Sequence, residues 1–162
     1  MAPELLQRVR DAVAPLVERF DLSHGMPVLT VAPGRLLETV RRLKEDLRFD
    51  LFLDVTAVDW PGEEQRFEVV YHFYSTQHRV RLRVKTRVAE GEPLVDSLVP
   101  LYGSAGYTER ECHDMFGIGF RGNPDLRPVL LYEGFVGHPL RKDYPKDREQ
   151  PLVPTRTREG QL

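Results

Sequence analysis

The most restrictive feature of this sequence is an alternating stretch at residues 79–88, in which every odd position is cationic and every even position but Thr86 is apolar. Alternation with a period of two is typical of a β-strand with one face in the core and the other in solvent. The segment 66–75 is also strand-like, and only three residues separate the two segments, so the sequence predicts a β-hairpin. Its open face carries Arg79, Arg81, Arg83, Lys85 and Arg87.

Apolar residues at helical spacing predict two amphipathic helices before this hairpin. The first is expected over residues 3–20, with a kink or break at Pro15, and the second over 34–47. Further expected elements are strands at 28–32 and 49–58, a short helical piece near 94–102, and a helix at 108–116 closed by Gly117. We therefore predict an α+β domain over residues 1–120, built on a mixed or antiparallel sheet packed by the two amphipathic helices.

The remaining segment, 121–162, is of a different kind, because its 42 residues include 6 prolines and 4 glycines. It is predicted to be a long irregular extension that lies along another surface. Its firmest anchor is expected at residues 138–145, where prolines fix an extended path and charges of both signs are available. Residues 146–162 are expected to be free in the isolated chain.

Composition narrows the possible functions. The 23 basic and 25 acidic residues give a net charge of −2, which argues against binding to nucleic-acid phosphates. Cys112 is the only cysteine, so this chain alone can form neither an internal disulfide nor a Cys₄ metal or iron–sulfur site. No apolar run approaches the roughly 20 residues of a membrane-spanning helix, so membrane association is expected only through a partner.

The densest polar cluster, residues 109–114, reads Glu-Arg-Glu-Cys-His-Asp. Adjacent residues diverge by about 100° around a helix, so Cys112 and His113 cannot form one nucleophile–base pair. Arg110 and Asp114 are four residues apart and are predicted to form an ion pair. A structural network is favoured over a catalytic site, although an enzyme that uses Glu111, His113 and Asp114 stays open as an alternative.

Two longer stretches, 109–131 and 134–145, resemble the 30-kDa subunit family of respiratory complex I, the proton-translocating NADH:quinone oxidoreductase. The first matches the family pattern at Glu-Arg-Glu, an acid, two apolar residues and a later Arg. The second matches the closing Gly-His-Pro-Leu-Arg-Lys-Asp-aromatic-Pro throughout. Asn123 stands where the family usually has His, and Cys112-His113 also departs from the pattern.

The resemblance implies a non-catalytic scaffold subunit in the peripheral arm, on the cytoplasmic side of the membrane. The complex passes electrons from NADH through FMN and iron–sulfur centres to quinone and couples this to proton translocation. It implies that FMN, the iron–sulfur clusters and quinone belong to partner subunits, and that this chain contributes no catalytic, cofactor-binding or metal-binding residue. The implied partners are the 49-kDa-type D subunit and the B subunit, with segment 121–162 docked on the 49-kDa-type subunit.

The same resemblance suggests which residues fix this arrangement, and Arg127 is expected to pair with one of the helix carboxylates. The candidate signature and interface residues are Glu109, Arg110, Glu111, Asp114, Asn123, Arg127, His138, Arg141, Lys142, Asp143 and Tyr144. Two alternatives remain. One is the equivalent subunit of a related energy-converting hydrogenase or F420-type dehydrogenase, and the other is a nucleic-acid-binding module that uses the basic strand.

Overall fold

The computed structural model describes residues 3–147 and Gln150. The α-helices have 11, 10 and 12 residues, and no helix in the described part is long and apolar enough to cross a membrane. The elements are α1 (Pro3–Val13), β1 (Val17–Ser23), β2 (Met26–Val31), the 3₁₀ turn η1 (Pro33–Arg35), α2 (Leu36–Glu45), β3 (Leu51–Asp59), β4 (Phe67–Ser75), β5 (Val80–Val88), β6 (Leu94–Asp96), α3 (Ala105–Phe116) and β7 (Gly119–Arg121).

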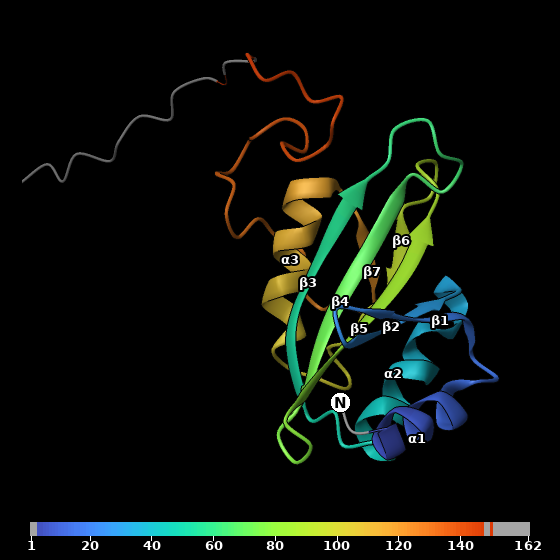
Figure 1. Ribbon diagram of the computed structural model, residues 1–162. Coiled ribbons are helices and arrows are strands. Elements are labelled where there is room, and N and C mark those ends of the chain that lie inside the picture. The colour runs from blue at the N-terminus through green and yellow to red at the C-terminus, as the bar shows by residue number, and fades with distance from the viewer. Residues whose placement is uncertain (1–2, 148–149, 151–162) are drawn as a thin grey trace, which may run out of the picture.

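Five strands form one mixed sheet in the order β1-β2-β5-β4-β3, and β6 and β7 form a small parallel pair (Figure 1). Strands β2 and β5 run parallel, while the other neighbours run antiparallel. The predicted hairpin is confirmed, since β4 and β5 pair from Phe67 opposite Val88 to Ser75 opposite Val80. The α+β class and the mixed sheet are therefore as the sequence predicts.

The core lies on one face of this sheet. Alternate residues of β4 and β5, including Phe67, Tyr71, Phe73 and Leu82, are fully buried against the helices. Burying one such large apolar side chain contributes about 1.5–3 kcal/mol. In Figure 1, α1 and α2 lie at one end of the sheet and α3 runs along β3, so the helices leave the cationic face of β5 uncovered.

Two expectations about the secondary structure were wrong. The predicted break at Pro15 is confirmed, since the first helix ends at Val13, but residues 17–23 form strand β1 and not a continuation of the helix. His24 and Gly25, both with positive φ, then make the two-residue turn that suits the twist of a hairpin with β2. The second correction concerns residues 94–102, which begin with strand β6 rather than a helix because β7 pairs alongside it.

Helix α3 starts at Ala105, three residues before its predicted start, and ends as predicted at Gly117. Gly117 adopts φ 72°, the left-handed conformation of a helix C-cap. The described residues after β7 are turns and irregular segments, as the proline content predicts. The prediction for residues 146–162 falls almost entirely outside the described residues.

Candidate functional site

Three polar side chains of α3 hold three different parts of the chain, and Glu109 is the deepest of them. Its carboxylate is fully buried and accepts hydrogen bonds from Ser97 Oγ and Leu98 N at 2.7 Å and from Asn123 Nδ2 at 2.8 Å. Burial raises the pKa of Glu109 even though three donors face it. Asn123 therefore has a structural task, joining the loop after β7 to the helix.

Arg110 and Asp114 hold the next part of the chain through its backbone. Arg110 donates to the carbonyl oxygens of Arg127 at 2.8 Å and Pro128 at 3.0 Å. Asp114 Oδ2 accepts from the N–H groups of residues 129 and 130 at 2.8 and 3.0 Å. Burial on its own raises the pKa of Asp114, but these N–H groups outweigh that effect, and the pKa lies below its ordinary value.

The predicted pairings of these residues were wrong. Arg110 does not pair with Asp114 but lies 3.8 Å from Asp125. Arg127 likewise pairs with Asp125, at 2.9 Å, and not with a helix carboxylate. The physical reason is that the loop offers Arg110 carbonyl acceptors and Asp114 amide donors, which satisfy both groups without a contact between them. Glu111 is exposed, with no ion pair or hydrogen bond within the described residues, and so does not belong to the network.

Residues 138–141 cap the C-terminal end of α3. The last carbonyl groups of a helix have no partner inside it, and a cation is favourable there. Here all four are paired. The pairs are His138 Nδ1 with Asp114 O at 2.9 Å, Leu140 N with Met115 O at 3.1 Å, Arg141 Nε with Phe116 O at 2.6 Å, and Gly117 N with His113 O at 2.7 Å. The segment that composition marks as an anchor thus packs on this chain's own helix.

Arg66 joins the same segment to the sheet. Its guanidinium forms a two-pronged pair with Asp59 at 2.7 and 2.8 Å and also contacts Asp143 at 2.9 Å and Glu90 at 2.6 Å. Asp59 additionally accepts from Lys142 N at 2.7 Å. The hydrogen bonds from Arg66 lower the pKa of both Asp59 and Asp143. The Asp59 side chain has no exposed surface and that of Arg66 has 8%, so this is a buried ionic centre.

Sequence reasoning missed Arg66 and Asp59 as site residues. Asp143 lies 77 positions from Arg66, and Lys142 lies 83 positions from Asp59, so no local spacing relates these residues. The available signal was a charged residue at the end of each of two predicted strands, which becomes informative only once β3 and β4 are known to pair.

Cys112 and His113 do diverge as helical geometry predicts, with Cys112 buried and His113 turned toward His138.

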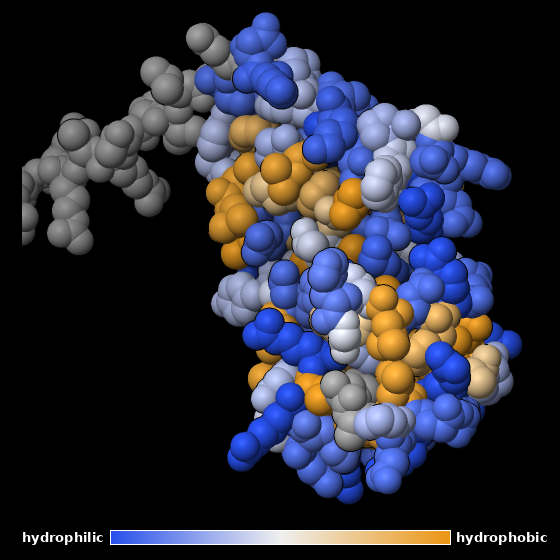
Figure 2. Space-filling model, in the orientation of Figure 1, coloured by the Kyte–Doolittle hydropathy of each residue, from blue (hydrophilic) through white to orange (hydrophobic). Residues whose placement is uncertain are grey.

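Residues 123–145, which pack on α3 and on the end of the sheet and which we call the docked segment, present an apolar outer surface. Its exposed apolar residues, which we call the apolar patch, are Val129, Leu130, Val136 and Leu140. Figure 2 shows hydrophobic residues gathered over this end of α3 and the segment that follows. A small cavity of about 130 Å³ opens beside the patch, with His113, His138 and Phe135 among its lining residues. Tyr144, by contrast, is half-buried and stacks on Phe135 with ring centroids 6.1 Å apart.

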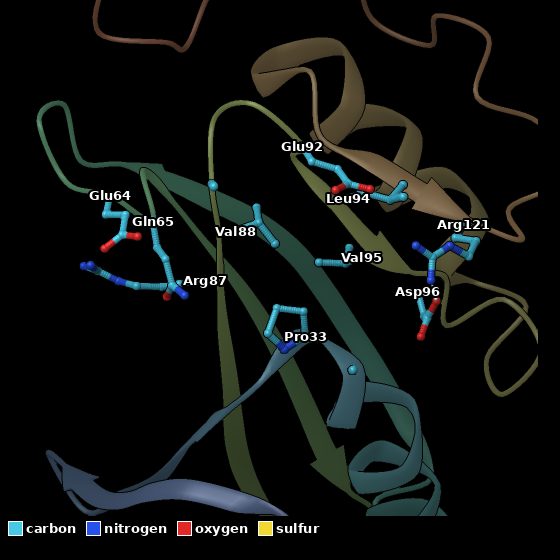
Figure 3. A pocket seen from close by; sticks show the side chains of 12 residues that line it. Pro33, Glu64, Gln65, Arg87, Val88, Glu92, Leu94, Val95, Asp96 and Arg121 are labelled. Atoms are coloured by element: carbon cyan, nitrogen blue, oxygen red, sulfur yellow. Dashed lines mark hydrogen bonds and ion pairs between the residues drawn. The ribbon is translucent and has the colours of Figure 1, made fainter.

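A second hollow, of about 410 Å³, lies between the end of β5, η1 and β6 (Figure 3). Its walls carry charges of both signs, such as Asp96 and Arg121, which lie 3.3 Å apart. None of the signature residues lines it. The polar groups that the sequence marked as candidates are gathered instead around α3 and the segment docked on it.

Acid is expected to release the docked segment. The pKa values of Asp59, Asp114 and Asp143 lie below the ordinary 3.8 in the folded chain. A carboxyl group with a lowered pKa stabilises the fold above its unfolded pKa, and this contribution is lost as the pH falls through the folded pKa. The amide resonances of Leu130 and Lys142 should therefore shift together in an NMR titration from about pH 5 to about pH 2. Asp143→Asn should make this shift smaller. Amide resonances of the wild-type chain that stay constant over the titration would contradict the expected release of the segment.

The sequence of this chain is similar to a known protein family and to several proteins of known name. The family model described as "Respiratory-chain NADH dehydrogenase, 30 Kd subunit" matches residues 29–150. A relative from Citrifermentans bemidjiense, the C subunit of NADH-quinone oxidoreductase, is 43% identical over 148 residues, which cover 85% of this chain and 92% of the relative. A relative from Bdellovibrio bacteriovorus, the C/D subunit of NADH-quinone oxidoreductase, is 44% identical, and the match covers 83% of this chain and 24% of the relative.

Among solved structures, a trypsin-resistant fragment (1–134) of Nqo5 has a similar fold. Its TM-score is 0.65 at 27% sequence identity, over 76% of this chain and 97% of the fragment. Structural similarity over this share of the chain agrees with the family match.

Proposed function

The chain belongs to the family of the respiratory-chain NADH dehydrogenase 30-kDa subunit, and from this membership we propose that it has a structural, non-catalytic role in the complex. One observation carries the proposal. Glu109, Arg110 and Asp114, the signature residues best suited to chemistry, are all hydrogen-bonded to this chain's own loops. Such groups are already satisfied by the fold, so their role is to hold the docked segment in place.

As part of this oxidoreductase, the chain belongs to a hetero-oligomeric assembly. Its neighbour in the proposal is the 49-kDa-type subunit, and the B subunit is proposed as a further partner. The relative that joins C and D in one chain supports the first assignment, because two parts of one chain are held close together. The apolar patch supplies the kind of surface that a stable contact buries, since exposed apolar residues gathered in one place mark interaction sites.

In this proposal FMN, iron–sulfur clusters and quinone are bound by other subunits. The chain lies in the peripheral arm on the cytoplasmic side and meets the membrane only through the complex. The hydrogenase-type, F420-type and nucleic-acid alternatives are not favoured, because the curated relatives are named as the C subunit of NADH-quinone oxidoreductase.

The contact with the 49-kDa-type subunit is tested with the double variant Leu130→Asp and Val136→Asp. Both side chains are exposed, at 60% and 56%, so the isolated chain should fold normally. Co-purification with the 49-kDa-type subunit should fall about ten-fold or more, since charges placed in the core of an interface are strongly unfavourable. Leu22→Asp, on strand β1, is the matched control, because Leu22 is also 54% exposed but lies outside the patch. Equal co-purification of the double variant and the control would exclude the patch as the contact.

The non-catalytic role is tested with Glu111→Gln in the intact complex. Turnover per assembled complex should equal that of the wild type, because Glu111 is an exposed residue outside the network. A variant complex that assembles in full but has lost turnover would refute the structural role.

A further inference from the structure

Four of the five cations of the alternating stretch lie on the open face of β5, and Arg79, with a positive φ, lies in the turn just before that strand. By their ion-pair partners, the five cations divide into two groups. Lys85 Nζ lies 2.9 Å from Glu68 Oε2, and Arg87 lies 3.8 Å from Glu63 and 3.9 Å from Glu68. These two cations therefore face carboxylates of their own chain. The sequence pattern did not distinguish them from the rest of the row.

The other three cations lie toward the start of β5 and lack such partners. Arg79 and Arg81 form no ion pair within the described part of the chain. Arg83 Nε donates to the ring nitrogen His72 Nε2 at 2.9 Å, which is a neutral acceptor and not a carboxylate. Among the residues that the structure describes, three guanidinium groups at alternate positions thus have no carboxylate in ion-pair contact.

Two of these arginines line an open hollow of about 360 Å³. It lies between the β1–β2 turn and the β4–β5 turn, which meet because β2 and β5 run parallel and so begin at the same end of the sheet. Its described walls contain no acidic residue. The lining residues are His24, Gly25, Met26, Tyr74, Arg79, Val80 and Arg81. The hollow therefore combines unbalanced positive charge with apolar walls.

We propose that this basic hollow, together with Arg83 beside it, is a second interaction surface that binds an acidic segment of a protein partner in an extended conformation. Side chains two residues apart on a strand lie about 6.5–7 Å apart on the same face. Arg81 and Arg83 thus repeat at the spacing at which an extended peptide presents alternate carboxylates. Each guanidinium offers a planar fork of donors that matches a carboxylate.

The geometry favours a peptide over other anionic partners. A flat lipid surface makes poor contact with a hollow, whereas single side chains enter it. The β4–β5 turn, which lines the hollow, lies at the opposite end of the sheet from the end of β3 (Figure 1), where Asp59 holds the docked segment. Occupation of the hollow therefore leaves the proposed contact with the 49-kDa-type subunit undisturbed.

The test uses a fluorescein-labelled peptide, Glu-Thr-Glu-Thr-Glu, titrated with the full chain by fluorescence anisotropy at low salt. The same peptide with glutamine for glutamate should not bind, and added salt should weaken binding because the contact is ionic. Arg81→Gln should weaken binding about five- to ten-fold. Arg87→Gln is the matched control, since it removes the same charge from the same strand face, and its affinity should stay within about two-fold of the wild type.

Each outcome decides the proposal. Equal losses for Arg81→Gln and Arg87→Gln would mean that binding follows net charge alone and would overturn it, as would a peptide that does not bind. Phosphatidylglycerol vesicles and a single-stranded oligonucleotide are titrated in parallel. Binding of either that depends on Arg81, without binding of the peptide, would overturn the proposal and assign the hollow to lipid or nucleic acid instead. Thermal melts that match the wild type show that the variants are folded.

Discussion

Replacing Arg66 with methionine is expected to lower the free energy of unfolding by about 3–5 kcal/mol. The change leaves the Asp59 carboxylate fully buried, with the Lys142 N–H as its one remaining hydrogen-bond donor among the described residues, and it also releases Asp143. Removing one partner of a buried ion pair costs more than the pair itself contributes, because the remaining charge is neither solvated nor compensated. Urea denaturation followed by circular dichroism measures the effect.

Two further variants test whether the loss of stability arises because the unpaired charge is buried, and not because one positive charge is removed. Arg127→Met removes an arginine whose side chain is 83% exposed and pairs only with Asp125 among the described residues, so stability should stay close to that of the wild type. The double variant Arg66→Met with Asp59→Leu should recover much of the lost stability, because it removes both buried charges. If Arg66→Met unfolds at the same urea concentration as the wild type, the ionic centre does not hold the segment to the sheet.

Gly117→Ala is expected to expel the docked segment from the end of α3. An added Cβ would overlap His138 Nε2 and lie 2.5 Å from Arg141 Nη2, the two side chains that cap the helix. Gly117 also has φ 72°, which a residue with a Cβ adopts at a cost of about 1 kcal/mol or more. The segment that includes residues 138–141 should therefore lose protection in hydrogen exchange and become sensitive to protease, and co-purification with the 49-kDa-type subunit should decrease.

The chain offers a matched control for this variant. Gly122 has φ 88°, but a Cβ at that position would meet nothing within 4 Å. Gly122→Ala thus carries the same kind of backbone strain without the collision, and it should lower stability while residues 138–141 stay protected. Equal exposure of the segment in both variants would show that strain, and not the fit between Gly117 and the cap, controls docking.

Local patterns in the sequence determined several parts of this structure. The alternation over residues 79–88 and the three-residue connection before it were sufficient for the β4–β5 hairpin, because a strand with one buried face must repeat every two residues. Gly117 marked the end of α3, since few other residues adopt the left-handed conformation of a C-cap. The motifs at 109–131 and 134–145 were sufficient for the family, which the comparisons confirm.

The tertiary structure alone decided which partner each polar group found. From the sequence, Arg110 and Asp114 were expected to pair because they are four residues apart on one face of the helix, yet both pair with backbone groups of a loop that packs against the helix. Asp59 and Arg66 stand on either side of the turn between β3 and β4, and Asp143 joins them from 77 positions further along the chain. A buried charge or carbonyl takes whichever donor or acceptor the packed chain brings within reach, because leaving it unpaired costs more than any local pairing gains. That choice depends on the whole fold, and no spacing along the chain encodes it.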